Sequence, residues 1–289
     1  MRKNILITGS KGQLGEELQM LFLQYPQYNF FPTDVDTLDL TDKDKLVRYI
    51  EQSSIDYIVN CAAYTAVDKA EDDIDFCYKV NRDTVKNMAE AACGKAKIIH
   101  ISTDYVFDGN HEYPYKETDL TNPQSVYGKS KREGEEVLLS LCPESIIIRT
   151  SWLYSSFGNN FVRTMLRLGK ERAELNVVAD QQGTPTYASD LAQAIMAIIT
   201  YVEKNEIFPA GIYHYSNEGE TTWFGFAEKI FEIANMNCKV NPVTTDQYPV
   251  KACRPMYSVL DKTKIKETFN IIIPQWENSL LQCIKQLNS

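Results

Sequence analysis

The sequence predicts an α/β protein with a Rossmann-type doubly wound parallel sheet and a smaller mixed α/β lobe. Three observations point to this fold. Short apolar segments alternate with segments of helical periodicity over the first 150 residues, which is the order of strands and helices in a parallel sheet covered on both faces. The first apolar segment leads into a glycine-rich turn at Gly9, Gly12 and Gly15. A chain of 289 residues is long enough for one large domain with a smaller lobe.

The predicted strands of the first half are short and apolar, as strands buried inside a parallel sheet usually are. They cover residues 3–8, 29–33, 56–62, 97–103 and 144–149, and a further one covers 175–179. The first predicted helix follows the glycine turn, where apolar residues recur at helical spacing at Leu14, Leu18, Leu21, Phe22 and Tyr25. The next helices are expected at residues 42–52, 75–92 and 126–141.

The second half is less regular. Helices are expected near residues 157–172, 188–203, 222–236 and 275–287, with short strand-like pieces such as 211–215 between them. We expect a dinucleotide-binding domain over residues 1–150 and a mainly substrate-binding lobe over 151–289. The sequence has no flexible linker, and a segment near 175–207 is expected to return to the first domain, so the two parts are interleaved.

The overall composition is typical of a soluble globular protein and argues against several classes of partner. With 39 acidic and 30 basic residues, the formal net charge of −9 disfavours a surface for nucleic acid or anionic membranes, which would be basic. No apolar run approaches the roughly 20 residues of a membrane span. The first apolar segment reaches the glycine turn too soon for a signal peptide. We therefore expect a cytoplasmic protein that acts on a small molecule.

The cysteines and histidines give no sign of a disulfide framework or a metal centre. The seven cysteines are scattered without a CxxC pair, and seven is an odd number. The histidines, His100, His111 and His214, are few and dispersed. We expect reduced, mostly buried thiols, structural histidines and no metal.

The glycine turn predicts a site for a dinucleotide cofactor. Its glycines lie between a predicted strand and a predicted helix, where they let the backbone approach a pyrophosphate while the helix amino terminus donates free N–H groups. Asp34 stands at the end of the second strand, where an acid can hydrogen-bond the ribose hydroxyls, and this favours NAD(H). Lys11 lies inside the turn and can meet a ribose phosphate, so NADP(H) remains an alternative.

A second motif, YxxxK from Tyr127 to Lys131, predicts a proton donor. If residues 126–141 are helical, these two side chains lie on one face, with an ammonium group close to a phenol. A free tyrosine has a pKa of about 10, and a fixed positive charge nearby lowers that pKa toward neutrality. Tyr127 is therefore a candidate general acid for carbonyl chemistry.

These motifs occur together in the order found in one enzyme family. In chain order they are TGxxGxxG from Thr8 to Gly15, the strand end Asn60-Cys61-Ala62-Ala63, Ser102-Thr103-Asp104, and YxxxK. With these motifs the chain resembles the extended short-chain dehydrogenase/reductases. Further stretches resemble the dTDP-4-dehydrorhamnose reductases of that family, and they are residues 63–71, 102–109, 149–154, 158–161, 180–186 and 254–255. The similarity extends from Asn4 nearly to the carboxyl end.

The resemblance implies a reaction and the residues that perform it. NADPH or NADH would deliver hydride to C4 of dTDP-4-dehydro-6-deoxy-L-mannose while Tyr127 protonates the developing alkoxide, giving dTDP-L-rhamnose. Lys131 would bind the nicotinamide ribose and tune Tyr127, and Thr103 would hydrogen-bond near the reacting oxygen. The implied cofactor positions are Gly9, Gly12, Gln13, Leu14, Gly15, Asp34, Asp39, Leu40, Ala62, Ala63, Tyr64, Thr65, Tyr127 and Lys131. The implied substrate positions are Thr103, Asp104 and Trp152, with Asn160 and Arg254 for the diphosphate.

Several of these residues have a structural alternative. Asp39 precedes a predicted helix and is as well placed to cap it as to reach adenine. Trp152 follows a buried strand and is either a core residue or an aromatic face against the methyl group of the sugar. Asp104 can be a turn residue, and Arg254 can form a surface ion pair.

Two other functions fit parts of the same pattern. A nucleotide-sugar dehydratase or epimerase shares the fold, but a dehydratase needs an acidic residue directly after the Thr-Asp pair, and Tyr105 stands there. A regulatory subunit like that of methionine adenosyltransferase would keep the cofactor site without needing turnover. The joint presence of Thr103, Tyr127 and Lys131 argues for an enzyme.

The resemblance also bears on metal binding and assembly. Some members of the family dimerise through carboxylates around a magnesium ion. Glu17 matches one such position, but Ser189 occupies another. Magnesium is therefore not expected, and a homodimer stays open.

Overall fold

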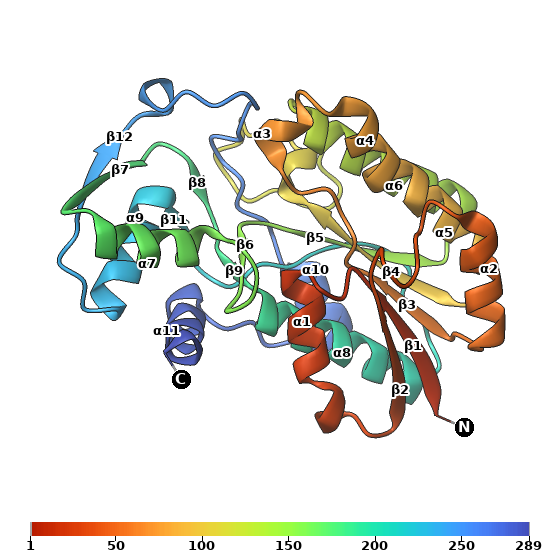
Figure 1. Ribbon diagram of the computed structural model, residues 1–289. Helices are drawn as coiled ribbons and strands as arrows, with labels where there is room; N and C mark the ends of the chain where they lie inside the picture. The colour runs from red at the N-terminus through yellow and green to blue at the C-terminus, as the bar shows by residue number, and fades with distance from the viewer. Residues whose placement is uncertain (1, 289) are drawn as a thin grey trace.

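A central six-stranded sheet organises the larger lobe of the computed structural model, which describes residues 2–288 (Figure 1). Its strand pairs are parallel, in the order β10-β5-β4-β3-β1-β2. These strands are β1 (Lys3–Thr8), β2 (Tyr28–Thr33), β3 (Tyr57–Asn60), β4 (Lys97–Thr103), β5 (Ser145–Thr150) and β10 (Gly211–His214). The parallel sheet predicted from the sequence is confirmed.

Helices cover both faces of this sheet because successive strand residues point to opposite faces. In β1, Ile5 and Ile7 belong to one core with residues of α1 (Gln13–Met20), α8 (Ala188–Asn205) and α10 (Thr263–Phe269). Leu6, between them in sequence, belongs to a second core with α2 (Lys43–Gln52), α5 (Thr84–Ala92) and α6 (Val126–Leu141). All three side chains are fully buried, so the sheet is the middle layer of a three-layer lobe.

The helix predicted over residues 75–92 is interrupted by a π-helical turn. It comprises α4 (Ile74–Tyr78), the π turn η2 (Lys79–Asp83) and α5. The turn places Asn81 inside the protein, where its amide donates to Ser130 Oγ of α6 at 3.0 Å. Gly134 of α6 allows this approach, because a Cβ there would lie 2.3 Å from the Asn81 carbonyl oxygen.

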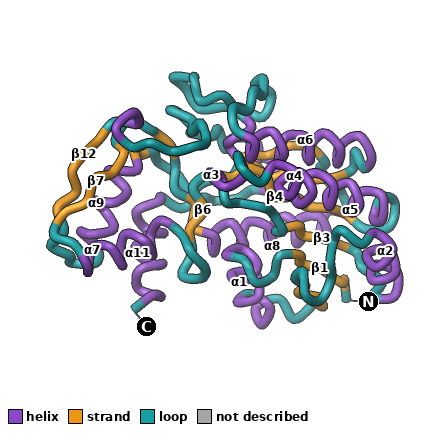
Figure 2. Tube along the Cα trace, turned by 45° about the horizontal axis from the view of Figure 1, so that its top comes forward, coloured by secondary structure: helices purple, strands orange, loops and turns teal. Residues whose placement is uncertain are grey.

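The smaller lobe packs around a core of its own (Figures 1 and 2). It contains α7 (Phe161–Glu171), α9 (Trp223–Ile233), α11 (Trp276–Leu287), and a parallel pair of β7 (Glu174–Val178) with β12 (Lys239–Val243). The strand expected at 175–179 thus forms, but it is not part of the central sheet as the alternation implied. Its exposed and buried residues alternate at the start, as in a strand with one face in solvent, whereas a central parallel strand is buried on both faces.

Short segments connect the two lobes. β6 (Leu153–Tyr154) pairs with β9 (Thr186–Tyr187), and β8 (Gln182–Gly183) pairs with β11 (Thr221–Thr222). Single turns form α3 (Val67–Ala70), η1 (Phe22–Gln24), η3 (Asp104–Val106) and η4 (Thr245–Gln247). The chain returns to the larger lobe twice. The first return comprises α8, which packs against α1, and β10 at the sheet edge, and the second is α10, which packs against both α8 and β10. Within residues 2–288 no helix has the length and apolarity needed to cross a membrane.

Candidate active site

Two adjoining cavities lie at the carboxyl ends of the sheet strands. The first, of about 440 Å³, is lined by the glycine turn, the end of β2 and the segment after β3. The second, of about 430 Å³, is lined by the same turn, the ends of β4 and β5, the start of α6 and parts of the smaller lobe. Gly9, Gly12, Cys61 and Ala63 line both cavities, so the two are parts of one cleft.

Every residue predicted for the site lines one of these cavities. In the first cavity lie Asp34, Asp39, Leu40, Ala62 and Tyr64 together with Gly9, Gly12 and Ala63. In the second lie Gln13, Leu14, Gly15, Thr65, Thr103, Asp104, Tyr127, Lys131, Trp152, Asn160 and Arg254. The fold therefore brings residues from both halves of the chain together in one cleft.

The glycine turn leaves no room for side chains. Gly9 has a φ of +65°, in the left-handed region, and a Cβ there would lie 2.7 Å from the backbone nitrogen of Ala62. A Cβ at Gly15 would lie 2.4 Å from the Gly9 carbonyl oxygen. Helix α1 starts directly after Gly12, which is its N-cap. The free N–H groups of its first turn are thus presented at the cleft, as a pyrophosphate requires.

Asp34 is fixed at the carboxyl end of β2. Its carboxylate accepts hydrogen bonds from the backbone N–H groups of Lys11 at 3.0 Å and Val35 at 2.8 Å. The side chain of Lys11 forms an exposed ion pair with Asp36 at 2.5 Å. An acid and an exposed cation therefore lie near each other at the rim, which leaves both nicotinamide cofactors structurally acceptable.

Asp39 does not cap the following helix. Its carboxylate accepts a hydrogen bond from the N–H of Thr41 at 2.8 Å and forms a local turn. The cap of α2 is Asp42, whose carboxylate accepts from the N–H of Lys45 at 3.0 Å. The capping alternative for Asp39 is wrong, because the helix starts later than a cap at that position requires.

Tyr127 and Lys131 are buried on the cleft-facing side of α6. The Lys131 ammonium donates to the Ile101 carbonyl at 2.6 Å, and burial lowers its pKa to about 8. Burial raises the pKa of the Tyr127 phenol above its usual value, and the nearby Thr103 hydroxyl offsets only part of that rise. The expected lowering of this pKa by Lys131 is therefore wrong, because the ammonium is directed at β4 and desolvation dominates. A phenol with a raised pKa keeps its proton until a stronger base forms beside it.

Asp104 carries an unsatisfied oxygen in the second cavity. Thr103 Oγ1 donates to its Oδ1 at 3.0 Å, whereas no hydrogen bond of standard geometry reaches its Oδ2 from the described residues, although the Ser258 hydroxyl lies near enough to lower the pKa of the carboxyl. Asp104 is 3% exposed, and burial raises its pKa to about 6. A buried acceptor without a donor is costly. A ligand hydroxyl in the cavity would supply that donor.

Trp152 forms a strained aromatic wall of the second cavity. Its φ of +47° lies in the left-handed region, which bulky residues rarely adopt outside functional sites. Its indole stacks on Trp223, with ring centres 3.7 Å apart and planes 11° apart. Gly183 packs close to the same indole, since a Cβ there would lie 2.7 Å from its Cε2 atom. Trp152 is partly exposed on the cavity wall and also packs against the core of the smaller lobe.

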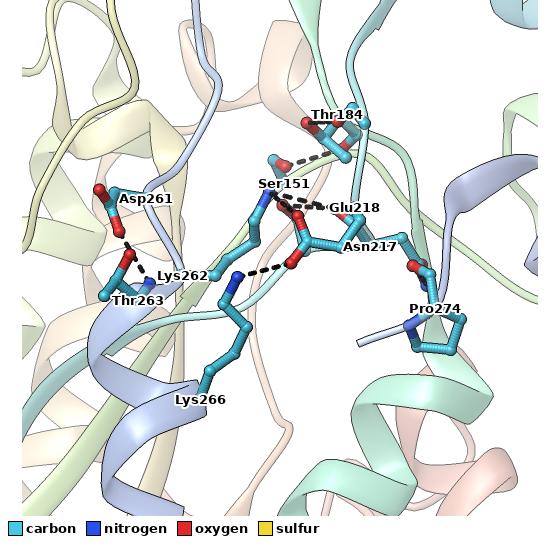
Figure 3. Close-up of polar contacts among 11 residues, drawn as sticks. Ser151, Thr184, Asn217, Glu218, Asp261, Lys262, Thr263, Lys266 and Pro274 are labelled. Carbon is cyan, nitrogen blue, oxygen red and sulfur yellow. Dashed lines mark hydrogen bonds and ion pairs between the residues drawn. The ribbon is translucent and has the colours of Figure 1, made fainter. Parts of the chain in front are cut away.

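The backbone beside Trp152 is anchored by polar contacts from the second half of the chain (Figure 3). Ser151 Oγ donates to the Thr184 carbonyl at 2.8 Å, and Thr184 Oγ1 donates to the Gly219 carbonyl at 2.8 Å. Next to them Lys266 donates to Glu218 at 2.9 Å. The position of the indole therefore depends on the connection between β10 and β11.

Comparison with known proteins identifies the family. The family model described as RmlD substrate binding domain matches residues 2–289. The chain belongs to this family. A dTDP-4-dehydrorhamnose reductase from Aggregatibacter actinomycetemcomitans is 45% identical over 284 residues, which cover 96% of each chain.

Solved structures of similar chains share the whole fold. A dTDP-4-dehydrorhamnose reductase from Clostridium acetobutylicum has a TM-score of 0.93 and 43% identity, covering 99% of this chain and 100% of that one. Another from Bacillus anthracis, in complex with NADP, has a TM-score of 0.93 and 40% identity with the same coverage. The predictions of the family, the Rossmann-type fold and a nicotinamide-dependent oxidoreductase are confirmed.

Two residues match diphosphate-binding positions of the family, and they differ in whether their side chains still have a free hydrogen-bond donor for a phosphate. Asn160 caps α7, because its Oδ1 accepts from the N–H of Arg163, and its amide nitrogen donates to the Ser155 carbonyl at 2.7 Å. Arg254 donates through Nη2 to Asp68 at 2.8 Å, an ion pair of the kind that the structural alternative describes. Its Nε is buried and has no partner within residues 2–288. Arg254 thus retains a donor for an anion, while the amide of Asn160 is already engaged.

Glu17, which matches a magnesium-binding position in some family members, is buried beneath the cleft. Ser155 Oγ donates to its carboxylate at 2.5 Å, and burial raises its pKa. Among the described residues there is no group of three or more His, Cys, Asp or Glu side chains able to hold a metal ion.

Sequence reasoning missed Trp223, which supports Trp152 and lines the second cavity. It belongs to no recognised motif and starts helix α9 in the smaller lobe. Its proximity to Trp152 arises only from the tertiary fold, and no sequence spacing signals it.

Proposed function

We propose that the protein reduces the 4-keto group of dTDP-4-dehydro-6-deoxy-L-mannose with NADPH or NADH, giving dTDP-L-rhamnose. The observation that carries the proposal is the buried Tyr127, which lines the same cavity as Thr103 and Lys131, in a cleft that also contains the glycine turn. The relatives named dTDP-4-dehydrorhamnose reductase support the substrate. The relative in complex with NADP supports the cofactor, and the crowded turn and Asp34 suit its pyrophosphate and ribose.

In this mechanism the bound nicotinamide supplies a hydride. Tyr127 stays protonated at neutral pH, because burial raises its pKa, and gives its proton to the carbonyl oxygen as that oxygen becomes an alkoxide. The Thr103 hydroxyl donates its single proton to Asp104 in the structure. Turned from Asp104 toward the substrate oxygen, it would donate to the developing charge and so stabilise the transition state. Lys131 would bind the nicotinamide ribose, and with a pKa of about 8 it is mostly charged at pH 7.

The deciding experiment supplies the protein with NADPH and the 4-keto sugar nucleotide and identifies the product by NMR. One oxidised cofactor per dTDP-L-rhamnose is expected. The counter-test supplies dTDP-glucose and NAD. No 4-keto-6-deoxy product is expected, because a dehydratase needs a base after Asp104 and burial raises the pKa of Tyr105, which keeps its phenol protonated. Dehydration at catalytic rates without reduction of the keto sugar would overturn the proposal.

Asp34→Ala is expected to shift the kcat/KM ratio toward NADPH. The carboxylate is placed to bind the free ribose hydroxyls of NADH and to repel a ribose phosphate, whereas Lys11 can attract that phosphate once the acid is gone. Steady-state kinetics with both cofactors measure the ratio. Asp36→Ala, which removes the exposed partner of Lys11, separates the effect of Asp34 from that of Lys11. A ratio unchanged in Asp34→Ala would mean that this carboxylate does not face the ribose.

Trp152→Ala is expected to raise the KM for the keto sugar with little change in Tm. Its indole is partly exposed on the cavity wall and offers an apolar face to the sugar methyl group. Trp276→Ala is the matched control, because Trp276 is 4% exposed in the core of the smaller lobe and its loss should cost about 3–5 kcal/mol of stability. A large loss of stability with unchanged KM in Trp152→Ala would assign the residue to the core instead.

A further inference from the structure

A row of polar side chains crosses the central sheet and ends at Lys131. Thr8 of β1, Asn60 of β3 and His100 of β4 are register partners in neighbouring parallel strands, so their side chains lie on one face of the sheet. All three are fully buried or nearly so. Thr8 Oγ1 donates to Asn60 Oδ1 at 2.7 Å, and Asn60 Nδ2 lies 2.9 Å from His100 Nδ1. At the end of the row, His100 Nε2 lies 3.4 Å from Lys131 Nζ.

We propose that His100 is a positioning residue that acts through Lys131. Asn60 holds the imidazole as the tautomer with its proton on Nε2, and this N–H, directed at Lys131, favours the neutral amine over the ammonium. His100 thereby helps to set the pH above which Lys131 loses its charge, and with it the upper pH limit of turnover. The inference rests on the proposed function, since it takes Lys131 as the residue that binds the nicotinamide ribose.

The tautomer follows from the groups that can only donate. The backbone N–H of Ala62 donates to Asn60 Oδ1 at 3.2 Å, and the Thr8 hydroxyl donates to the same oxygen. These two bonds orient the amide, so its Nδ2 faces His100. Because an amide nitrogen donates and does not accept, His100 Nδ1 is the bare ring nitrogen. Burial holds the pKa of His100 well below its ordinary value, so the ring carries a single proton, and that proton is on Nε2.

The contact with Lys131 agrees with this tautomer. Lys131 Nζ donates to the Ile101 carbonyl at 2.6 Å, whereas its distance of 3.4 Å to His100 Nε2 exceeds the range of about 2.7–3.2 Å that is usual for hydrogen bonds. An ammonium group has no acceptor, so it gains nothing from a second N–H directed at it. A neutral amine has a lone pair that accepts this N–H. The tautomer of His100 therefore favours the neutral form of Lys131.

Other ionisable groups also surround Lys131. They are Cys61 after β3, Cys77 of α4, and Tyr127 and Glu135 of α6. Burial raises the pKa of both thiols and of the phenol, so these three groups are neutral at pH 7. Glu135 favours the ammonium, but its carboxylate accepts two hydrogen bonds from Arg149. Burial lowers the pKa of Lys131 to about 8, and the histidine N–H acts in the same direction.

The first test determines the tautomer by NMR of the whole protein with isotopically labelled histidine. Nitrogen shifts distinguish a protonated ring nitrogen from a bare one, and with three histidines in the chain, His100→Phe assigns the His100 signals. We expect the proton of His100 on Nε2. His214 is the internal control and is expected to carry its proton on Nδ1, which lies 3.0 Å from the Tyr115 carbonyl. A proton on Nδ1 of His100 at pH 7 would overturn the proposal.

The second test reverses the tautomer with Asn60→Asp. The carboxylate still accepts from Thr8 and Ala62, but an oxygen replaces the Nδ2 donor. The proton of His100 should then move to Nδ1, which makes Nε2 an acceptor for the Lys131 ammonium. Lys131 should bind its proton about tenfold more tightly, the effect of one hydrogen bond to a charged group. NMR titration with labelled lysine, assigned with Lys131→Arg, measures this affinity without turnover. An unchanged proton affinity of Lys131 would overturn the role of His100.

A double variant separates the tautomer from the added charge. Asn60→Asp combined with His100→Phe keeps the carboxylate but removes the imidazole through which it acts. The proton affinity of Lys131 should then lie within about twofold of that in His100→Phe alone. A tenfold gain that persists in the double variant would assign the effect to charge and overturn the route through His100. If Asn60→Asp does not fold, the tautomer of wild-type His100 decides alone.

The reductase assay separates this inference from the proposed function. In the active enzyme, the basic limb of the kcat profile of Asn60→Asp should move to higher pH, because Lys131 keeps its charge longer. Wild-type protein with the expected His100 tautomer and Lys131 titrations, but no reduction of the keto sugar, would overturn the function and leave the effect of His100 on Lys131 standing. Reduction of the keto sugar by the wild type, with the Lys131 titration unchanged in Asn60→Asp, would overturn this inference alone.

Discussion

Tyr127→Phe is expected to bind NADPH normally and to lose roughly 10²–10⁴-fold in turnover, the usual effect of removing a general acid. The phenol is buried on the cleft-facing side of α6 and lines the second cavity, and burial keeps it protonated until an alkoxide forms. Phenylalanine preserves the ring and removes the transferable proton. Cofactor affinity is measured by titration, and turnover by oxidation of NADPH in the presence of the keto sugar.

Tyr105→Phe is the matched control. Its ring packs edge-on against Tyr127 with centres 5.4 Å apart, and it is partly buried in the same cavity wall. Its hydroxyl has no part in the proposed proton transfer, so turnover within a few-fold of wild type is expected. If Tyr127→Phe retained turnover equal to that of Tyr105→Phe, the proton donor would have to be another group.

Glu135→Ala is expected to lower the free energy of unfolding by about 3–5 kcal/mol, as the breaking of a buried ion pair does. Glu135 and Arg149 are 0% and 1% exposed, and Arg149 donates to both carboxylate oxygens, at 2.9 and 2.7 Å. Arg149 Nη1 has no partner among the described residues even with Glu135 in place. Removing the carboxylate leaves a guanidinium charge buried between α6 and β5. Urea unfolding followed by circular dichroism measures the loss.

Two comparisons define the cause of that loss. Glu171→Ala removes an exposed partner of Arg167 on α7 and should cost no more than about 0.5 kcal/mol. Replacing Glu135 and Arg149 together by leucine and methionine should recover most of the stability, because no charge is then left unpaired. A change below about 1 kcal/mol in Glu135→Ala would show that water or another residue satisfies Arg149.

The local parts of the fold and of the site were predictable from the sequence, because they follow from short-range patterns. The glycine turn, Asp34 at the end of β2, and Tyr127 with Lys131 on one side of α6 depend on spacings of a few residues. The limits of α6 match the predicted residues 126–141. Each of these features is determined within a single βα unit.

The features that the sequence did not predict depend on long-range contacts. The direction of the Lys131 ammonium is decided by a carbonyl of β4, and the stacking of Trp152 by Trp223 of another helix. Sequence patterns identify both β7 and β10 as short strands. Which sheet each strand joins is decided by its pairing with a strand distant in sequence. Periodicity identifies a strand but does not identify its neighbour.

The return of the chain to the larger lobe limits how segments of this protein can be exchanged with those of its relatives. β5 is paired on one side with β4 and on the other with β10, which follows it by some sixty residues of sequence. Helix α8 supplies many of the apolar side chains on one face of this sheet. A gene fragment ending at residue 150 would encode a sheet with an open edge at β5 and an uncovered apolar face. Exchange of substrate preference between relatives therefore requires several short grafts, around α7, β7 to β8, and β11 to β12, and cannot be achieved by a single crossover.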